Sequence, residues 1–453
     1  MWAACGLAAV SVPSAFAPAW TSLVWVLDVA LLALVAVDWR RTPDPAGLEV
    51  ERRVPPTVGL GGELTREVSI AGARAGAAVE LFEEYPEHAV LARHTIGDRS
   101  VDAEAAHEGE RADTGRADEL GSCRLARTYT LTRRGRFALG DLRIRLSSPL
   151  GLVTRQVRLA GSSEFSVEPA LLNLRRHLAL AASERWQDLG VRRVRRYGGR
   201  TEFESLRDYV VGDDLRTVDW KATAKRGKTT VRQYQEERGQ ELILMIDCGR
   251  RMRATAAHGR AAGWSKLDWA LDAGLQLAAI ALQRGDRVGA LAFDSDVRAW
   301  VAPARGALQL ARLRESLFAL LPTSTEPDFA RALRVLAARH RRRALVLILS
   351  DVADNWTVEH QRRAFASAAR RHRLIFAALD DPSLRAAAAG ELERSDLEVS
   401  PAALRAASME LVEDRRRALA DLRAGGIRVL NPVPAEAAGP LIAAWLEARR
   451  GAG

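Results

Sequence analysis

The first forty residues are almost entirely apolar. Residues 1–27 contain no charged side chain, and Thr21–Trp39 approaches the roughly 20 apolar residues that a membrane-spanning helix requires. Residues 2–20 would form a shorter first span that two prolines interrupt. The pattern therefore predicts a membrane anchor of one or two spans over residues 1–41, with a transmembrane helical hairpin as the favoured form.

The charges that follow this segment set its expected orientation. Arg40 and Arg41 come directly after the apolar run and have no counterpart before it, which places the rest of the chain in the cytoplasm. A cleaved secretory signal is the alternative, because Ala15-Phe16-Ala17 resembles a cleavage site. The apolar character continues beyond that site, however, and a retained anchor is favoured.

Alternation of apolar and polar residues indicates β-strands over residues 48–170. Leu48–Val54, Thr65–Ile70 and Arg143–Leu146 all alternate, and glycine-containing turns punctuate the region. Several short strands of this kind predict a small β-sandwich. The acidic, alanine-rich segment 97–121 has no such period and is expected to be a loop.

Residues 240–450 alternate between strand-like and helix-like patterns. Glu241–Asp247 and Ala344–Asp351 are apolar runs that each end in an aspartate, whereas Ser265–Gln283 has apolar residues at helical spacing. Buried strands separated by helices predict a doubly wound α/β domain with a parallel sheet. Ligands of such sheets bind beyond the carboxyl ends of the strands, where both aspartates are expected.

The positive net charge of the chain does not by itself identify the kind of partner that the protein binds. The net charge of +10 over 453 residues raises nucleic acid as a partner, but only four of the 67 basic residues are lysine. Such a general arginine preference does not by itself make a nucleic-acid binder. Cys5, Cys123 and Cys248 are too few for a disulfide framework and match no zinc spacing, which favours a reducing compartment.

The motifs of common enzymes are missing from the sequence. There is no Gly-x-x-x-x-Gly-Lys-Ser/Thr phosphate loop and no Gly-x-Ser-x-Gly nucleophile elbow, and the eight histidines show no ligand spacing. A metal-dependent hydrolase that used Asp247 and Asp351 would lack a base and enough ligands. We therefore expect a protein that is not an enzyme.

A distinctive block lies in the basic connector of residues 171–239. It runs from Arg196-Tyr-Gly-Gly-Arg to Asp213-Asp-Leu-Arg-Thr-Val-Asp-Trp-Lys and, with Ser148-Pro-Leu-Gly-Leu, resembles the signature of the domain-of-unknown-function 58 family. The signature residues, which are also candidates for docking a partner, are Arg196, Tyr197, Gly198, Gly199, Arg200, Glu202, Phe203, Arg207, Asp208, Tyr209, Asp213, Asp214, Arg216, Asp219, Trp220 and Lys221.

The resemblance implies a bacterial inner-membrane protein whose soluble domains lie in the cytoplasm. It also implies that residues 240–450 are similar to a von Willebrand A domain and that a MoxR-type AAA ATPase is the partner. No cofactor follows from it. The function that we expect is that of a non-catalytic adaptor, which presents its von Willebrand A-like face to protein partners and works with this ATPase.

Von Willebrand A domains often bind Mg²⁺ through oxygen ligands at a metal-ion-dependent adhesion site. The resemblance places Asp247, Gly249, Arg251, Thr325 and Asp351 at that site as the partner-binding face. Glycine and arginine replace both serines of the Asp-x-Ser-x-Ser motif, so the site is degenerate. We expect the Arg251 guanidinium to lie near Asp247 or Asp351 in place of a metal, with a weak Mg²⁺ site as the alternative.

The connector contains the densest group of charges. Lys221, Lys225 and Lys228 lie close to several aspartates, and either a docking surface for an acidic or phosphorylated partner or an internal ion-pair network would explain them. Trp220 and Tyr209 are expected to pack the connector.

An alternative function for the whole chain is nucleic-acid binding. Residues 192–200 would then form a phosphate-binding stripe whose affinity falls steeply with salt.

Overall fold

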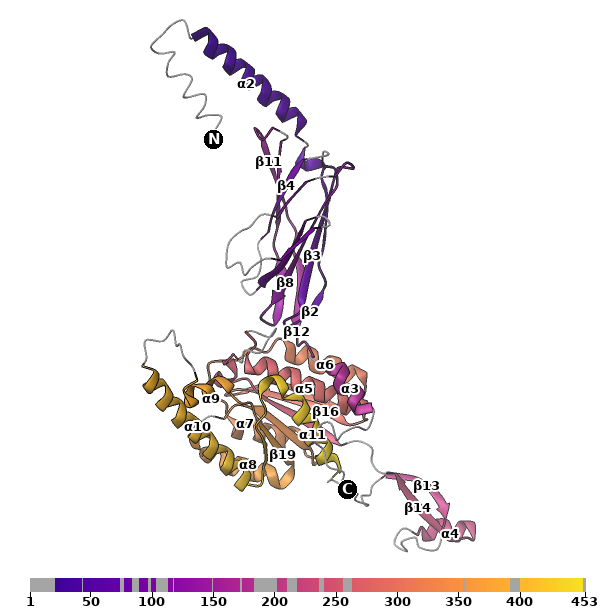
Figure 1. Ribbon diagram of the computed structural model, residues 1–453. Helices are drawn as coiled ribbons and strands as arrows, with labels where there is room; N and C mark the ends of the chain where they lie inside the picture. The colour runs from indigo at the N-terminus through magenta and orange to yellow at the C-terminus, as the bar shows by residue number, and fades with distance from the viewer. Residues whose placement is uncertain are drawn as a thin grey trace. The chain divides into compact units, whose positions relative to one another are not determined.

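The chain divides into two compact units, residues 1–167 and residues 168–453 (Figure 1). The computed structural model describes residues 21–42, 44–73, 77–83, 89–96, 99–102, 113–116, 118–148, 150–171, 173–182, 202–209, 218–235, 240–255, 263–352, 355–391 and 400–450.

The described part of the first unit begins with one helix, α2 (Thr21–Arg41). Across the residues that the structure describes, no helix is both long and apolar enough to cross a membrane. The predicted transmembrane hairpin is therefore wrong. Asp28 lies within the apolar part of α2, and Asp38, Arg40 and Arg41 lie in its last turn. Residues 1–20, predicted as the first span, lie outside the described residues.

The last turn of α2 is bound by the β-structure of the same unit. Asp38 is fully buried, where its carboxylate accepts hydrogen bonds from the Ser148 hydroxyl and from the backbone N–H groups of Leu150 (3.3 Å) and Leu152 (3.2 Å). The Arg155 guanidinium lies over the Trp39 ring, 4.4 Å from its centroid. Donors of the Ser-Pro-Leu-Gly-Leu segment thus bind the Asp38 carboxylate at the end of the helix.

Three sheets follow α2 in the first unit. A five-stranded antiparallel sheet has the order β1-β3-β8-β5-β6, a four-stranded antiparallel sheet the order β11-β10-β4-β7, and a three-stranded sheet the order β2-β12-β9. The strands are β1 (Glu49–Arg53), β2 (Thr57–Gly59), β3 (Glu63–Ala71), β4 (Ala78–Glu83), β5 (Ala89–Ile96), β6 (Arg99–Asp102), β7 (Asp113–Arg116), β8 (Cys123–Leu131), β9 (Gly135–Leu139), β10 (Leu142–Ser147), β11 (Thr154–Leu159) and β12 (Ser163–Glu168).

Alternation along these strands produces one buried layer. Val68 of β3 and Leu125 of β8 pack with Val79 of β4 and Ile144 of β10, so the first two sheets face each other across an apolar core. Segment 97–121, expected to be a loop, contains β6 and β7 on either side of residues 103–112, which lie outside the described residues.

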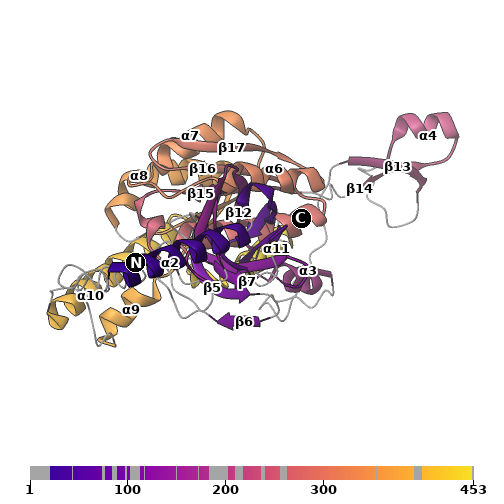
Figure 2. The ribbon, with the colours of Figure 1, turned by 90° about the horizontal axis from the view of Figure 1, so that it is seen from above.

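The second unit opens with elements of the predicted connector. They are the helix α3 (Leu174–Ala182), the strand β13 (Glu202–Asp208), the helix α4 (Trp220–Arg226) and the strand β14 (Thr230–Gln235). The strands β13 and β14 pair antiparallel, and α4 belongs to the same small unit (Figure 2). The N–H of Asp219, the N-cap of α4, donates to the Thr230 carbonyl of β14 at 2.9 Å.

A six-stranded sheet with the order β17-β16-β15-β18-β19-β20 forms the centre of the α/β structure. All neighbouring pairs are parallel except β16–β17, which is antiparallel. The strands are β15 (Glu241–Asp247), β16 (Arg287–Phe293), β17 (Val297–Ala304), β18 (Leu345–Ser350), β19 (Arg373–Ala378) and β20 (Arg428–Leu430).

Helices cover both faces of this sheet (Figures 1 and 2). Alternate residues of β15 supply two separate cores, because Leu244 packs with α5, α6 and α11 whereas Met245 packs with α7, α8 and α10. The helical elements are η5 (Arg250–Arg253), α5 (Lys266–Gln283), α6 (Ala307–Phe318), α7 (Phe329–Arg339), α8 (Asn355–Arg371), α9 (Pro382–Ala389), α10 (Pro401–Ala424), η7 (Pro434–Glu436) and α11 (Ala438–Arg450).

Candidate functional site

The candidate site lies at the carboxyl edge of the six-stranded sheet. Asp247 is the last residue of β15. Ser350 is the last residue of β18, which pairs directly with β15, and Asp351 follows it. A helix that follows a parallel strand starts at the same edge, so the first residues of α5 and α9 also reach this place. These starts bring Lys266 and Asp381 to the site.

Capping residues fix both helix starts. Ser265 and Asp268 form a capping box at α5, in which the Ser265 N–H donates to the Asp268 carboxylate at 2.7 Å. Lys266 is therefore held in the first turn of α5. Asp381 is the N-cap of α9, and its carboxylate accepts from the Leu384 N–H at 3.2 Å.

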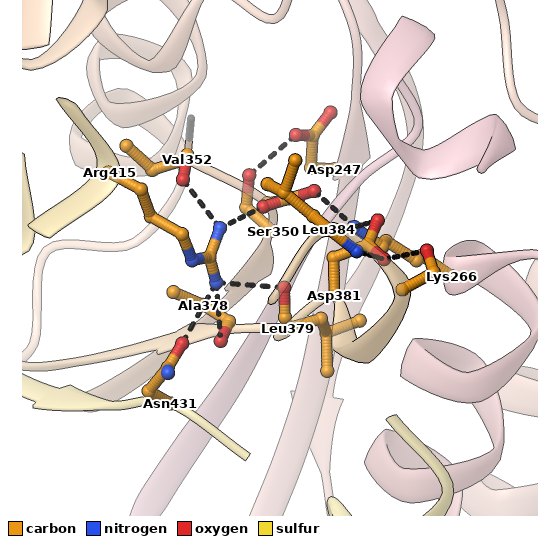
Figure 3. A network of polar contacts seen from close by, with 12 residues as sticks. Asp247, Lys266, Ser350, Val352, Ala378, Leu379, Asp381, Leu384, Arg415 and Asn431 are labelled. Carbon is orange, nitrogen blue, oxygen red and sulfur yellow. Dashed lines mark hydrogen bonds and ion pairs between the residues drawn. The ribbon is translucent and has the colours of Figure 1, made fainter. Parts of the chain in front are cut away.

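Asp247 is buried and held by two short hydrogen bonds. Its carboxylate accepts from the Gly249 N–H at 2.7 Å and from the Ser350 hydroxyl at 2.6 Å (Figure 3). Burial raises the pKa of Asp247 from 3.8 to about 7, and the charges of Asp351 and Glu326 act in the same direction, while the two hydrogen bonds oppose them. The neutral form of this carboxyl is thus unusually accessible near neutral pH.

Asp351 lies between two buried cations. The Lys266 ammonium donates to one carboxylate oxygen at 2.6 Å, and the Arg415 guanidinium binds the other (Figure 3). Lys266 is only 2% exposed and also donates to Asp381 at 2.9 Å. Burial alone would raise the pKa of Asp381, but the Ser383 hydroxyl and Lys266 bring it below its ordinary value.

Arg415, on α10, ties several chain segments together. Besides Asp351, its guanidinium donates to the carbonyl oxygens of Val352 (2.5 Å) and Leu379 (2.8 Å) and to the side-chain oxygen of Asn431 (2.9 Å). These acceptors follow β18, β19 and β20. One arginine therefore closes the edge of three neighbouring strands (Figure 3).

The predicted adhesion-site residues are only partly brought together. Asp247, Gly249 and Asp351 lie in the site, and Arg251 lies in η5 with a half-buried side chain, whereas Thr325 is exposed and its hydroxyl hydrogen-bonds that of Thr323 at 2.9 Å. The cations at Asp351 are Lys266 and Arg415, so the place expected for Arg251 is taken by other residues.

The residues present do not fit a magnesium ion. A Cβ on Gly249 would lie 2.9 Å from Pro327 Cδ and 3.0 Å from Asp247 Oδ1, so no serine ligand fits there. Each carboxylate oxygen of Asp247 and Asp351 already has an internal donor. Within the described ranges, no cluster of three or more His, Cys, Asp or Glu side chains is arranged to hold a metal.

Sequence reasoning missed Lys266, Arg415, Ser350, Asp381 and Asn431. Two signals pointed to Lys266: it is the one lysine outside the 221–228 window, and it follows the N-cap of a predicted helix. Arg415 carried no such signal, because it is one of many arginines and its partners are distant in sequence.

Only some of the signature residues lie within the part of the chain that the structure describes. Arg196, Tyr197, Gly198, Gly199, Arg200, Asp213, Asp214 and Arg216 lie outside the described residues, as does the predicted phosphate stripe of residues 192–200. Glu202, Phe203, Arg207 and Asp208 belong to β13, and Asp219 caps α4. Tyr209 is half-buried, whereas Trp220, expected to pack, is 69% exposed, and Lys221 is exposed as well.

Comparison with known proteins supplies the family. The family model described as "Protein of unknown function DUF58" matches residues 205–409. An uncharacterized protein of Mycobacterium tuberculosis is 30% identical over 239 residues, which make up 52% of this chain and 72% of that protein. The chain belongs to this family. An uncharacterized protein of Mycobacterium bovis matches to the same extent, with 30% identity over 52% of this chain and 72% of its own length.

The stretch that matches the DUF58 model includes α4, Asp247, Lys266, Asp351 and Asp381, but it ends before Arg415.

Solved structures add little. The conserved hypothetical protein BatB from Bacteroides thetaiotaomicron is 14% identical, covers 48% of this chain and all of its own (100%), and has a TM-score of 0.31. A cohesin module from Clostridium perfringens is 16% identical over 28% of this chain and 97% of its own, with a TM-score of 0.22. Similarities this low support no inference.

Proposed function

We propose that this DUF58 protein is a non-catalytic adaptor whose α/β structure binds a protein partner at the carboxyl edge of its sheet. The family resemblance of the sequence suggests a MoxR-type AAA ATPase as that partner. The observation that carries the proposal is that each oxygen of the two strand-end carboxylates is bound by a donor of the chain itself, from Lys266, Arg415, Ser350 or the Gly249 N–H.

Burial and these internal contacts argue against chemistry at this edge. A general base must reach the proton it removes, and a metal ligand needs a free lone pair directed at the ion. Asp247 has no exposed surface, and Asp351 is only 8% exposed and carries two cations. These carboxylates serve to hold the edge in one conformation, which supports a role in presentation to a partner.

The exposed rim of the same edge supplies groups that a partner can reach. Arg250 and Glu326 form an ion pair with both side chains about half exposed, and Thr325, next to Glu326 in the chain, is exposed. The Arg250 N–H donates to the Thr325 carbonyl at 2.9 Å, so the two loops that carry these residues are joined. A rigid rim with charges of both signs is suited to electrostatic recognition of a protein surface.

The test uses the purified full-length chain and the MoxR-type ATPase of the same organism, with and without ATP. We expect nucleotide-dependent binding that Thr325→Arg weakens by about tenfold or more, since a long side chain at the centre of an interface introduces a steric clash with the partner. Thr154→Arg, at an exposed position on β11, is the matched control and should bind like the wild type. Lack of ATPase binding in both nucleotide states would refute the adaptor role.

If the wild type binds and Thr325→Arg binds equally well, the adaptor role stands but the rim is not the contact surface. Unfolding transitions of both variants, measured beside the wild type, separate a lost contact from a lost fold.

A further inference from the structure

The short helix α4 is fixed firmly for its length. At its start the Asp219 carboxylate accepts from the backbone N–H groups of Lys221 and Ala222, both at 3.0 Å. At its end Gly227 has φ 68° and donates its N–H to the Thr223 carbonyl at 2.9 Å. The Thr223 hydroxyl accepts from the Thr230 N–H of β14 at 3.0 Å. Its side chains therefore project from a defined scaffold.

One face of α4 points to solvent. Successive helical residues are about 100° apart, which places Trp220, Lys221, Ala224 and Lys225 on one side. All four are exposed, whereas Ala222 and Thr223 on the other side are half-buried. Trp220 is 69% exposed, and the small Ala224 lies one turn beyond it, beside Lys225. We call Trp220, Lys221, Ala224 and Lys225, with Lys228 in the following turn, the α4 face.

The α4 face does not serve the stability of its own helix. Lys221 and Lys225 are four positions apart, where like charges repel and destabilise a helix by a few tenths of a kcal/mol. An indole exposed to this degree gains little from burial on folding. Among the described residues, no acidic side chain pairs with Lys221, Lys225 or Lys228.

We propose that the α4 face is a docking surface for an acidic segment of a partner protein, in which carboxylates surround an apolar side chain. The ammonium groups would pair with the carboxylates, and the indole would cover the apolar side chain beside Ala224. This inference concerns α4 and is independent of the function proposed for the strand-end edge.

The residue types favour acidic protein over nucleic acid. Arginine is the better donor to phosphate because its planar guanidinium binds two oxygens at once, and this chain uses arginine almost everywhere else. Three of its four lysines nevertheless lie at Lys221, Lys225 and Lys228. Single-stranded nucleic acid is bound in grooves with several stacking rings, whereas the α4 face has one indole on a convex helix.

The test measures fluorescence anisotropy of a labelled peptide in which Phe-Leu is flanked by glutamates, added to the full-length chain. A peptide with glutamine for glutamate and an oligonucleotide of equal net charge are the competing probes. We expect the acidic peptide to bind, Lys221→Glu with Lys225→Glu to weaken binding by about tenfold or more, and Trp220→Ala to weaken it by about threefold to tenfold.

Two matched variants control for general charge and for general apolar surface. Arg341→Glu with Arg342→Glu makes the same charge change at exposed positions before β18, and Leu308→Ala removes an exposed apolar side chain from α6; both should bind like the wild type. Absence of peptide binding by the wild type overturns the proposal. So does equal loss in the arginine variant, or binding of the oligonucleotide in preference to the acidic peptide.

Discussion

Asp351 connects two buried cations that come from opposite directions along the chain. Lys266 and Arg415 both have exposures below a tenth, and each contacts a different oxygen of this carboxylate. Taking such charges out of water is unfavourable unless they are paired. The network therefore stabilises the fold only when all of its members are present, because loss of one member leaves the others buried with unbalanced charge.

The first prediction concerns that balance. Asp351→Ala should lower the free energy of unfolding by about 3–5 kcal/mol, as expected when a buried ion pair loses one partner. Urea denaturation measures the change. Glu413→Ala removes a carboxylate from exposed ion pairs with Arg416 and Arg417 and should leave stability close to that of the wild type. Equal stability of Asp351→Ala and the wild type would refute the network. Asp351 is accordingly a poor probe of partner binding, and the exposed Thr325 is a better one.

A second prediction concerns Asp247 and pH. Because its pKa is about 7 in the folded protein and 3.8 ordinarily, the folded state binds more protons than the unfolded state between these values. Stability from this group is therefore present below pH 4 and is lost as the pH rises through 7, by on the order of a few kcal/mol.

Asp247→Asn should remove that dependence, because an amide can accept from the Gly249 N–H and donate to the Ser350 hydroxyl without titrating. The difference in unfolding free energy between the variant and the wild type, measured from pH 4 to pH 8, should shift in favour of the variant as the pH rises. A difference that stays constant over this range would contradict the raised pKa.

At the scale of elements, the loop between β15 and η5 is closed around Gly249. A Cβ there would meet Pro327 Cδ at 2.9 Å and the Thr325 carbonyl oxygen at 3.0 Å. Gly249→Ser, which restores one serine of the adhesion motif, should thus destabilise the protein by about 1–3 kcal/mol and confer no stabilisation by Mg²⁺. Thermal unfolding with Mg²⁺ or with a chelator measures both effects. Gly439→Ser, at a position with no atom nearby, is the control. Stabilisation of Gly249→Ser by Mg²⁺ would show that this loop can open.

The central elements could be predicted from the sequence because their patterns are local. The run Glu241–Asp247 is β15, Ala344–Asp351 contains β18, and the helix predicted at Ser265–Gln283 differs from α5 by its capping residue. The antiparallel edge strand β17 and the helix α10 were not predicted. β17 is half-exposed and contains a proline, and α10 is rich in arginine and alanine with little apolar contrast.

The candidate site was predictable only as far as strand ends reveal it. Asp247 and Asp351 follow apolar strands, so their place at one edge follows from parallel pairing. Arg251 was chosen because it is close to Asp247 in sequence. Arg415 occupies that role because α10 packs on the face of β18 and β19, a tertiary fact that no local pattern contains.

At the scale of the whole molecule, the two units have separate buried ion pairs. In the first unit Glu83 binds Arg52 at 2.6 Å and Arg66 at 3.2 Å, and the side chains of Glu83 and Arg66 are fully buried. Asp351 has the corresponding place in the second unit. We expect two calorimetric transitions. Glu83→Ala should lower the midpoint temperature of one of them, and Asp351→Ala should lower that of the other. A single transition, whose midpoint temperature both variants lower equally, would mean that the two units unfold together.

The amino-terminal prediction was wrong at this same scale. Hydrophobic content suggested a pair of spans, but the described residues include no helix suitable for one. Asp38, which ends the apolar run, is buried and accepts a hydrogen bond from the Ser148 hydroxyl of the β-structure.

The position of Arg415 also has a consequence for synthesis on the ribosome. Lys266 precedes Asp351 by 85 residues, whereas Arg415 follows it by 64. At about 5–20 residues per second, the guanidinium emerges several seconds after the carboxylate that it neutralises. During that interval β18 and β19 lack the residue that joins their ends, and a nascent chain that stalls there exposes an unfinished sheet edge to chaperones and proteases. The α/β structure can therefore close only after α10 has been translated and has left the ribosome.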